Sequence, residues 1–275
     1  LLGIDVGTTG CKAAVFSGDG RLLATAYAEY DVQRPRPGWA ELDAARVLEQ
    51  VKGTIRRAVT APGAGEVQAL AVSSLGEAMV PVTEDRQVLG PSILNFDVRG
   101  AGYLPDLQSA LGEERLYRIS GNTLGNHFGL TKLMWVQEHQ PRLYERAWKF
   151  LPWGCLVAFM LGADPVVDYS LANRILLFDL EGEAWSRELL AASGLDEARL
   201  PATAPTGTLI GRVPARLAAE LGLPPGVAIV AGAHDQCANA VGCGVIDEGH
   251  AMWGMGTYTC IVPVYRQRRE PQGMI

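Results

Sequence analysis

The sequence predicts an α/β fold built on a mixed sheet. Three short apolar segments, residues 1–6, 13–16 and 22–27, are separated by tight turns and predict an antiparallel meander. A helical pattern and another buried strand follow, and this combination is typical of a sheet that is mixed rather than purely parallel. With 275 residues, 48% of them hydrophobic, the chain can bury the core of one large domain or of two ordinary ones.

The next elements follow from capping and periodicity. Asp43 is a suitable helix N-cap, and apolar residues recur after it at helical spacing as far as Val59. Beyond this crossover helix the sequence predicts strands at residues 67–74, 79–82 and 92–96.

The middle of the chain, from about residue 100 to residue 207, is richer in helical pattern and resembles an insertion into the α/β core. Residues 131–139 and 141–148 each predict one helix. The elements predicted after it are a strand at 226–232, a helix at 235–242, and two strands at 250–256 and 258–265 that are joined through Gly256 and Thr257.

Charge and cysteine usage exclude several classes of protein. The net charge of −6 comes from 24 basic and 30 acidic residues, and it gives no electrostatic footprint for nucleic acid or an anionic membrane. The five cysteines have no C-x-x-C spacing, so neither a disulfide framework nor a zinc site is indicated. The longest apolar run, residues 151–163, is too short to cross a bilayer, and the N-terminus has no basic leader. We therefore expect a cytoplasmic protein with reduced thiols that binds small molecules.

Two segments place glycine and threonine together in a turn between strands: "IDVGTTG" at residues 4–10 and "WGMGTYT" at residues 253–259. Glycine allows the backbone to approach closely, so that successive amides can point at one anion, and threonine hydroxyls add uncharged donors. Together the two turns could hold a polyphosphate, while each turn alone is weak evidence, because Gly-Thr turns are common in ordinary hairpins. The chain contains neither a P-loop nor the glycine spacing of a dinucleotide-binding fold.

Two aspartates are placed beside these predicted strand ends. Asp5 lies near the end of the first strand, where a buried carboxylate needs a partner, and Mg²⁺ on a nucleotide would supply one. Asp235 follows a strand and begins a small-residue helix, a position typical of functional groups. The residues leave alternatives open: Asp5 as a cap of its own turn, Asp235 as a helix N-cap, and Lys12, which could reach the same anion, as a solvated residue.

The ordered motifs resemble the FGGY carbohydrate kinases, a family that includes xylulose, gluconate and glycerol kinases. The resemblance covers the whole chain, and the order of the motifs is more specific than any one of them. The motifs that carry it are "GIDVGTTGCKAAVF", "ELD", "AVSS", "ILNFDVRG", "SGNTLGNHFGLTKLMWVQEHQP", "VVDYSLAN", "VAGAHDQCANAVGCG" and "GMGTYTC".

This resemblance implies a ribonuclease H-like lobe of the actin and hexokinase type, with ATP and sugar bound in a cleft between two lobes. Residues 1–246 would form the N-terminal, sugar-binding lobe with its helical insertion. Residues 247–275 would be the opening strands of a truncated second, nucleotide-binding lobe. The adenine site would lie beyond residue 275, so the isolated chain is expected to be inactive.

The resemblance also implies roles for individual residues. Asp235 matches the catalytic base, and Asp5 would serve Mg²⁺. The phosphate- and nucleotide-binding residues would be Gly7, Thr8, Thr9, Lys12, Gly256 and Thr257. The sugar-binding residues would be Glu77, Asp97, Arg99 and His127. Taken singly, Glu77 also fits an exposed turn, Asp97 and Arg99 an ordinary ion pair, and His127 a satisfied loop histidine.

Three departures from the family pattern leave the identity of the sugar open. Asn95 stands where the family has a tryptophan, Gly76 and Glu77 replace the Met-His of xylulose kinases, and Tyr258 replaces the serine after Gly-Thr.

The function implied is phosphorylation of a hydroxyl of a small sugar, sugar acid or polyol, with ATP and Mg²⁺ as cofactors. The alternative is a non-catalytic sugar-sensing or scaffold relative with the same fold. An actin-like or chaperone-like ATPase ranks third, because the polar set at the sugar site argues against it. No nucleic acid or membrane partner is expected, and a homodimer is left open.

Overall fold

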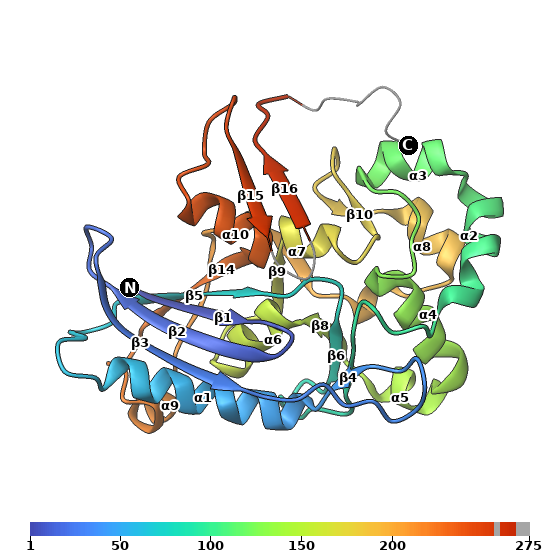
Figure 1. The fold of residues 1–275 in the computed structure, drawn as a ribbon. Coiled ribbons are helices and arrows are strands. Elements are labelled where there is room, and N and C mark those ends of the chain that lie inside the picture. The colour runs from blue at the N-terminus through green and yellow to red at the C-terminus, as the bar shows by residue number, and fades with distance from the viewer. Residues whose placement is uncertain (256–258, 268–275) are drawn as a thin grey trace.

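A six-stranded mixed sheet forms the centre of the fold (Figure 1). The structure, a computed structural model, describes residues 1–255 and 259–267. The strands lie in the order β13-β14-β5-β1-β2-β3. Their bounds are β1 (Leu2–Val6), β2 (Gly10–Phe16), β3 (Leu22–Glu29), β5 (Ala69–Ser74), β13 (Leu209–Arg212) and β14 (Ala228–His234).

The strand directions confirm the predicted mixed sheet. β1, β2 and β3 form the antiparallel meander, whereas β5 is parallel to β1 and β14 is parallel to β5. Helix α1 (Ala44–Val59) is the crossover between β3 and β5. Asp43 caps this helix as predicted, because its carboxylate accepts a hydrogen bond from the backbone N–H of Arg46 at 3.1 Å. Strand β13, which is antiparallel to β14, was not predicted.

Two helices cover the same face of the sheet. Helix α1 packs on β2 and β3, and α6 (Trp153–Met160) packs on β1, β5 and β14. Side chains alternate along β1, so that Leu2, Ile4 and Val6 are buried under these helices while Asp5 points to the opposite face. One strand therefore supplies the apolar core and a carboxylate for the open side.

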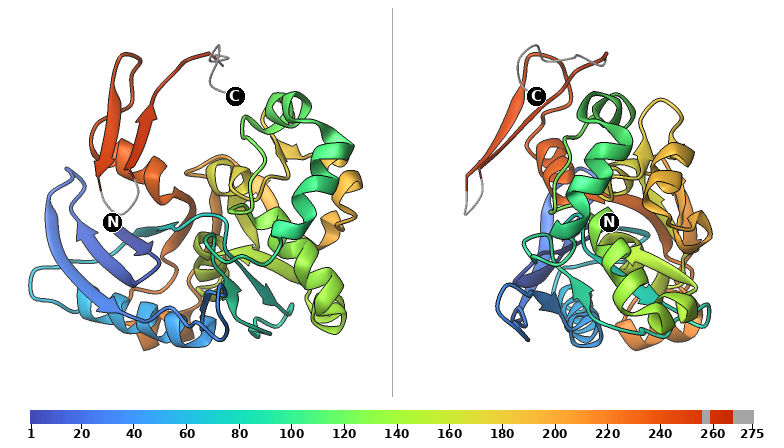
Figure 2. Two further views of the ribbon diagram at one scale, coloured as in Figure 1. Left: turned by 45° about the vertical axis from the view of Figure 1, so that its right-hand side comes forward. Right: turned by 90° about the vertical axis from the view of Figure 1, so that its right-hand side faces the viewer.

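The helical part of the chain lies to one side of the sheet (Figures 1 and 2), as predicted for an insertion. Its helices are η1 (Ala101–Tyr103), α2 (Leu104–Leu111), α3 (Glu113–Ser120), α4 (Gly129–His139), α5 (Pro141–Arg146), α7 (Tyr169–Asn173), α8 (Arg187–Ser193) and η2 (Glu197–Arg199). Helix α9 (Ala215–Leu221) packs near α1. The predicted helix over residues 141–148 is shorter, because the backbone N–H of Trp148 donates to Val82 instead of continuing the helix.

Short strands connect this part to the core. They form the pairs β4 (Glu41–Leu42) with β7 (Ser92–Ile93), β6 (Met79–Val82) with β8 (Lys149–Pro152), β9 (Val166–Asp168) with β12 (Ala202–Ala204), and β10 (Phe178–Asp179) with β11 (Ala184–Trp185). The strand predicted over residues 92–96 ends early, because the backbone N–H of Asp97 turns back to the carbonyl of Leu94.

The C-terminal elements are α10 (Asp235–Gly242) and a hairpin of β15 (Ala251–Met255) and β16 (Thr259–Pro263), as the sequence predicted. They share a small cluster of buried residues separate from the main core: Ala240, Val245 and Met252. The turn that joins the two strands lies outside the described residues. Within the described ranges, no helix has the length and apolar character needed to cross a membrane.

Candidate active site

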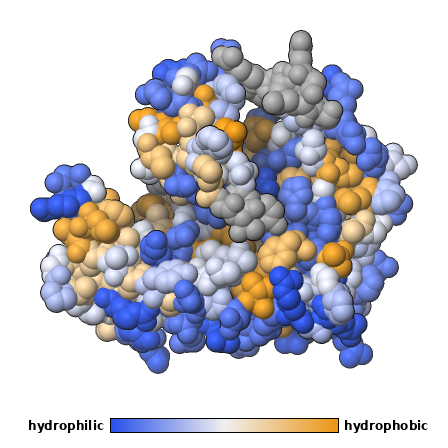
Figure 3. All heavy atoms as spheres, viewed as in Figure 1, coloured by the Kyte–Doolittle hydropathy of each residue, from blue (hydrophilic) through white to orange (hydrophobic). Residues whose placement is uncertain are grey.

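The open face of the sheet and α10 border a cavity of about 910 Å³. Asp5 from β1 and Asp235 from α10 both line it, although they come from opposite ends of the chain. Lys12 and Ser73 lie on its sheet side. Figure 3 shows the surface hollowed between the β2–β3 end of the sheet and the β15–β16 hairpin above it. Two carboxylates taken from separate motifs therefore share one recess.

Asp5 is held by a neighbouring strand. The hydroxyl of Ser73 donates to Asp5 Oδ1 at 2.6 Å, so the carboxylate bonds across to β5, and within residues 1–255 and 259–267 it makes no turn-capping hydrogen bond of the kind left open above. The surrounding walls raise the pKa of Asp5 by removing water, the Ser73 hydrogen bond lowers it, and the charge of Asp235 raises it again. Asp5 and Asp235 thus line the same cavity, and the charge of Asp235 adds to the rise in the pKa of Asp5.

The first glycine–threonine turn is tied together by one buried tyrosine. The backbone N–H of Gly7 donates to the carbonyl of Gly10 at 2.9 Å. The hydroxyl of Tyr30 reaches the carbonyls of both Gly7 and Gly10, at 2.7 and 3.0 Å. Thr8 and Thr9 are half-buried and exposed, and among the described residues their hydroxyls have no hydrogen bond. Gly256 and Thr257, the predicted second turn, lie outside the described residues.

Asp235 carries an acceptor atom with no donor. It is the first residue of α10, and the N-cap is His234, so the N-cap alternative does not describe it. Its Oδ1 is buried and has no hydrogen-bond partner among the described residues, although His234 Nε2 lies 3.1 Å away. Burial lowers the pKa of His234 to about 4, so this contact does not join opposite charges near neutral pH. Burial raises the pKa of Asp235.

Glu77 lies beside Asp235 and is paired with a basic residue. It is 8% exposed and has a left-handed backbone conformation with φ of 64°, so the exposed-turn alternative does not fit. Arg174, which follows α7, donates to Glu77 Oε1 from Nε at 2.8 Å and also from Nη2. Burial raises the pKa of Glu77, the Arg174 charge lowers it, and the charge of Asp235 raises it.

Asp97 and Arg99 form part of a buried network away from the large cavity. Arg99 pairs with Asp97 and with Glu41, each at 2.7 Å, and its guanidinium carbon lies 3.8 Å from the ring centroid of Trp39 and 4.9 Å from that of Trp135. Asp97 has no exposed surface, and its Oδ2 also accepts from the backbone N–H of Ala40 at 2.6 Å. The ion-pair alternative therefore describes the contacts of these two residues, and their sugar-binding role stays a prediction.

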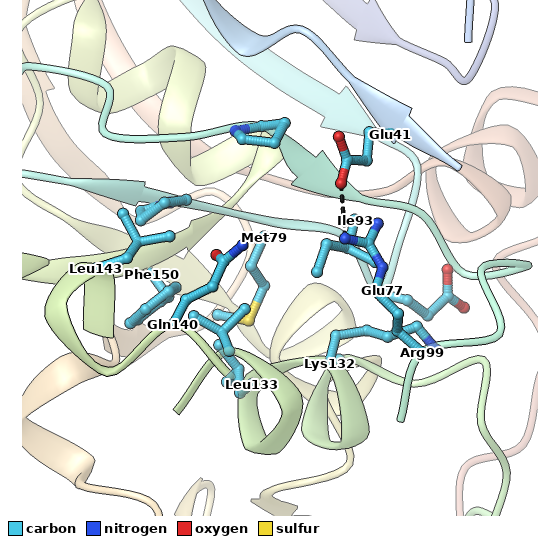
Figure 4. A pocket seen from close by; sticks show the side chains of 14 residues that line it. Glu41, Glu77, Met79, Ile93, Arg99, Lys132, Leu133, Gln140, Leu143 and Phe150 are labelled. Carbon is cyan, nitrogen blue, oxygen red and sulfur yellow. Dashed lines mark ion pairs between the residues drawn. The ribbon is translucent and has the colours of Figure 1, made fainter. Parts of the chain in front are cut away.

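Glu41 and Arg99 of this network line a small cavity of about 30 Å³ together with Glu77 (Figure 4). Its walls include the Glu41–Arg99 pair, Met79 and Lys132. A space of this size holds a water molecule and not a sugar. Lys132 turns its ammonium group toward the backbone carbonyl and side-chain oxygen of Asn126, which fixes the loop before α4.

His127 stands at the exposed end of that loop. Its ring lies 4.0 Å from the ring of Phe128, on which Arg174 also stacks at 4.8 Å. Partial burial lowers the pKa of His127, and the charges of Arg174 and Lys132 lower it further. His127, Arg174 and Glu77 therefore belong to one neighbourhood, with Asp235 beside it.

Comparison with known proteins decides the family. Residues 1–242 match the model for the N-terminal domain of the FGGY family of carbohydrate kinases. The chain belongs to the FGGY family. The match ends with α10, so it includes both Asp5 and Asp235 and every element of the central sheet.

Individual relatives are named as sugar or autoinducer-2 kinases, and a solved structure among them has the same fold as this chain. A xylulose kinase from Klebsiella pneumoniae is 30% identical over 260 residues, which are 93% of this chain and 52% of the relative. An autoinducer-2 kinase from Salmonella choleraesuis is 30% identical over 265 residues, 94% of this chain and 50% of the relative. The crystal structure of xylulose kinase from Rhodospirillum rubrum has a TM-score of 0.89 at 25% identity, covering 95% of this chain and 54% of that one. The chain spans about half the length of the curated relatives it matches.

Within this FGGY domain, sequence reasoning missed Arg174. Arg174 directly follows the "VVDYSLAN" segment that carried part of the resemblance, and the four residues after it, 175–178, are all apolar. That isolated charge was the available signal. Its partner Glu77 is 97 positions away, so the pair itself leaves no local pattern.

Proposed function

We propose that the protein transfers a phosphoryl group from ATP to a hydroxyl group of a small sugar, sugar acid or polyol. The observation that carries this proposal is the placement of Asp5 and Asp235 in one cavity, where Asp235 has a buried acceptor atom that receives no hydrogen bond from any described residue. The unpaired Oδ1 of Asp235 suits a general base, because it is available to accept a proton from a substrate hydroxyl. Asp5 in the same cavity suits the charged phosphate side of the reaction.

In this proposal Asp235 is the general base. The substrate hydroxyl would donate its hydrogen bond to Oδ1, the oxygen would attack the γ-phosphorus, and its proton would pass to Asp235 as ADP leaves. The role needs a carboxylate that is ionised at the working pH and that lies within hydrogen-bond reach of the hydroxyl. Its place at the start of α10 lets the helix dipole favour the charged form.

The phosphates would lie against the glycine–threonine turn. The backbone amides and the free hydroxyls of Thr8 and Thr9 would supply donors, and Lys12 would supply a charge at the same edge of the cavity. Gly256 and Thr257 remain the proposed second turn. Residues 1–246 are proposed as the sugar-binding lobe and residues 247–275 as the beginning of the nucleotide-binding lobe.

Asp5 is proposed to serve Mg²⁺. No group of three or more His, Cys, Asp or Glu side chains in the described part of the chain could hold a metal ion. A lone carboxylate fits Mg²⁺ in another way, because this ion is commonly bound by one or two carboxylates together with substrate phosphates and water. Bound there, it would neutralise the charge that develops on the phosphate oxygens.

The test is sugar-dependent formation of ADP by the full-length gene product. A panel of pentuloses, aldonates and polyols should contain at least one compound that raises ADP formation well above the rate without sugar. A non-catalytic relative would bind a sugar without forming ADP, and an ATPase would form ADP at a rate indifferent to the panel. Either result would reject the kinase proposal.

We expect kcat of the full-length gene product to fall on the acid side with an apparent pKa above 3.8. Burial raises the pKa of Asp235 from that ordinary value, so protonation of the base begins at a higher pH than for an exposed aspartate. The measurement is a pH–rate profile at saturating substrates. The Glu77→Gln variant should keep this acid limb, and loss of the limb in that variant would assign it to Glu77 instead.

Replacing Tyr30 by phenylalanine should weaken the binding of ATP and leave the binding of sugar unchanged. The Tyr30 hydroxyl holds the carbonyls of Gly7 and Gly10, and its loss leaves the phosphate turn less fixed. Since a hydrogen bond contributes about 0.5–1.5 kcal/mol, KM for ATP should rise by about twofold to twelvefold. Tyr144→Phe is the matched control, because Tyr144 is also buried and its hydroxyl accepts from Asp196 at a distant site. Equal KM values for ATP in both variants would contradict the proposed turn.

A further inference from the structure

The hydroxyl of Ser170 joins two segments that meet beside Asp235. Ser170 lies at the start of α7 and lines the large cavity together with Asp235. Its oxygen accepts a hydrogen bond from the backbone N–H of His234 at 2.8 Å. His234 is the last residue of β14 and the N-cap of α10, so this bond holds the backbone directly before Asp235. Ser170 is therefore attached to the peptide that leads into the proposed base.

A buried carboxylate fixes the direction of that hydroxyl. Ser170 donates to Oδ1 of Asp168, which is 2% exposed and is the N-cap of α7. The same Oδ1 accepts from the backbone N–H groups of Ser170 at 2.9 Å and of Leu171 at 3.1 Å. Because the hydroxyl proton points at Asp168, the oxygen keeps its lone pairs for the N–H of His234. Hydrogen bonds to one carboxylate oxygen thus hold the start of α7, and with it the hydroxyl of Ser170, in place.

Pairing within the sheet leaves the end of β14 irregular. The pairing of β14 with β5 shifts register between Val230 and Ala233. A Cβ atom at Gly232 would lie 1.9 Å from the carbonyl oxygen of Val72, so the two backbones approach unusually closely there. An irregularity of this kind bends a strand and redirects the side chains near it. The hydrogen bond to Ser170 comes directly after this irregularity and fixes the direction in which the chain enters α10.

The carboxylate of Asp235 depends on that direction. Its Oδ1 receives no hydrogen bond from any described residue, so the position of this oxygen follows from the backbone that carries it. The ring of His234 is in contact with it, because Nε2 lies 3.1 Å from Oδ1. That ring packs closely on Gly76, where an added Cβ atom would lie only 3.0 Å from Nε2. A shift of His234 would therefore move the proposed base.

We infer that Ser170 is a positioning residue for Asp235: by holding the N–H of His234, it keeps the carboxylate aimed at the hydroxyl group of the substrate. This rests on the proposed kinase function. Ser170 takes no part in the proton transfer, since its own proton is donated to Asp168. A base must lie within hydrogen-bond reach of the proton it removes, and a displacement of about 1 Å can cost about 10²-fold in rate. Ser170 thus acts on kcat through geometry alone.

Ser170→Ala in the full-length gene product tests this role by steady-state turnover with the best sugar. The variant removes the acceptor of the His234 N–H, so kcat should fall by about tenfold to a hundredfold, while KM for sugar and for ATP should change by less than about twofold. Ser170→Thr restores a hydroxyl group and should recover kcat to within about threefold of the wild-type value. If Ser170→Ala does not fold, Ser170→Cys carries the test and should show the same loss of kcat, because a thiol is a weak acceptor.

A second background separates positioning from a general structural defect. If Ser170 acts through Asp235, Ser170→Ala should lower the kcat of an Asp235→Asn protein by less than about twofold, because the base that it aims is already absent. Ser186→Ala is the matched control. The Ser186 hydroxyl also accepts from a backbone N–H, that of Leu189 at 3.3 Å, but it lies at the start of α8 and outside the lining of the cavity. The control should lower the thermal midpoint by a comparable amount and leave kcat unchanged.

The outcomes separate this inference from the proposed function. Sugar-dependent ADP formation by the wild-type protein, together with an unchanged kcat in folded Ser170→Ala, would overturn the positioning role and keep the kinase. An equal loss of kcat in the wild-type and Asp235→Asn backgrounds would also overturn the positioning role. Absence of sugar-dependent ADP formation with every member of the panel would overturn both.

Discussion

Asp235→Asn is expected to lower kcat by about 10²–10⁴-fold, the range that a positioned general base supplies. The amide cannot accept the proton of the attacking hydroxyl, whereas its shape preserves the start of α10 and the contact with His234. KM for sugar and for ATP should change far less than kcat, because the lost interaction belongs to the transition state. The assay is steady-state turnover of the full-length gene product with its best sugar.

Folding of this variant should not suffer. Burial raises the pKa of Asp235, so the charged form of this residue disfavours the folded state at any pH above that pKa. Removing the charge should leave the thermal midpoint at neutral pH unchanged or higher. Asp106→Asn, at an exposed position in α2, is the control and should keep full turnover. Near-normal activity of a folded Asp235→Asn protein would remove this residue from the mechanism.

Arg99→Met is expected to lower the free energy of unfolding by about 3–5 kcal/mol, as breaking a buried ion pair does. The variant leaves Glu41 and Asp97 buried without their shared cation and removes the cation–π contacts with Trp39 and Trp135. The measurement is equilibrium unfolding in urea.

The matched control removes an arginine from an exposed pair. Arg115 pairs with Glu188 at 2.6 Å, but both side chains are largely exposed. Arg115→Met should therefore change stability by less than about 1 kcal/mol. If Arg99→Met were as mild as this control while raising KM for sugar, Asp97 and Arg99 would return to the sugar site, where the family resemblance had placed them.

The parts of the fold that the sequence predicted are those with a local pattern. Short apolar segments separated by tight turns predicted the meander, and the spacing after Asp43 predicted α1 together with its cap. Helix α6 was missed because its residues are buried almost throughout, from Trp153 to Phe159, so no polar face marks its turns. Strand β13 was missed because its pairing with β14 is irregular and short.

Site residues could be predicted where a sequence motif surrounds them. They could not be predicted where their environment is set by residues far away in the sequence. Asp5 and Asp235 each lie at a strand end within a glycine-rich segment, and both reached the same cavity. Arg99 also lies within a motif, but its environment is set by Glu41, Trp39 and Trp135, which come from two other segments. No local pattern could report that it is stacked and buried. The same holds for Arg174 and Glu77.

The alternation along β1 links the chemistry of this protein to its folding. Leu2, Ile4 and Val6 enter the core from the same strand that presents Asp5, and each is 2% exposed or less. A slip of the strand by one position would push the aspartate among those apolar side chains and turn the core residues out to water. A register error therefore costs free energy in two ways, because it buries a charge and it exposes apolar side chains. Asp5 thus disfavours every other alignment of β1 in a compact sheet.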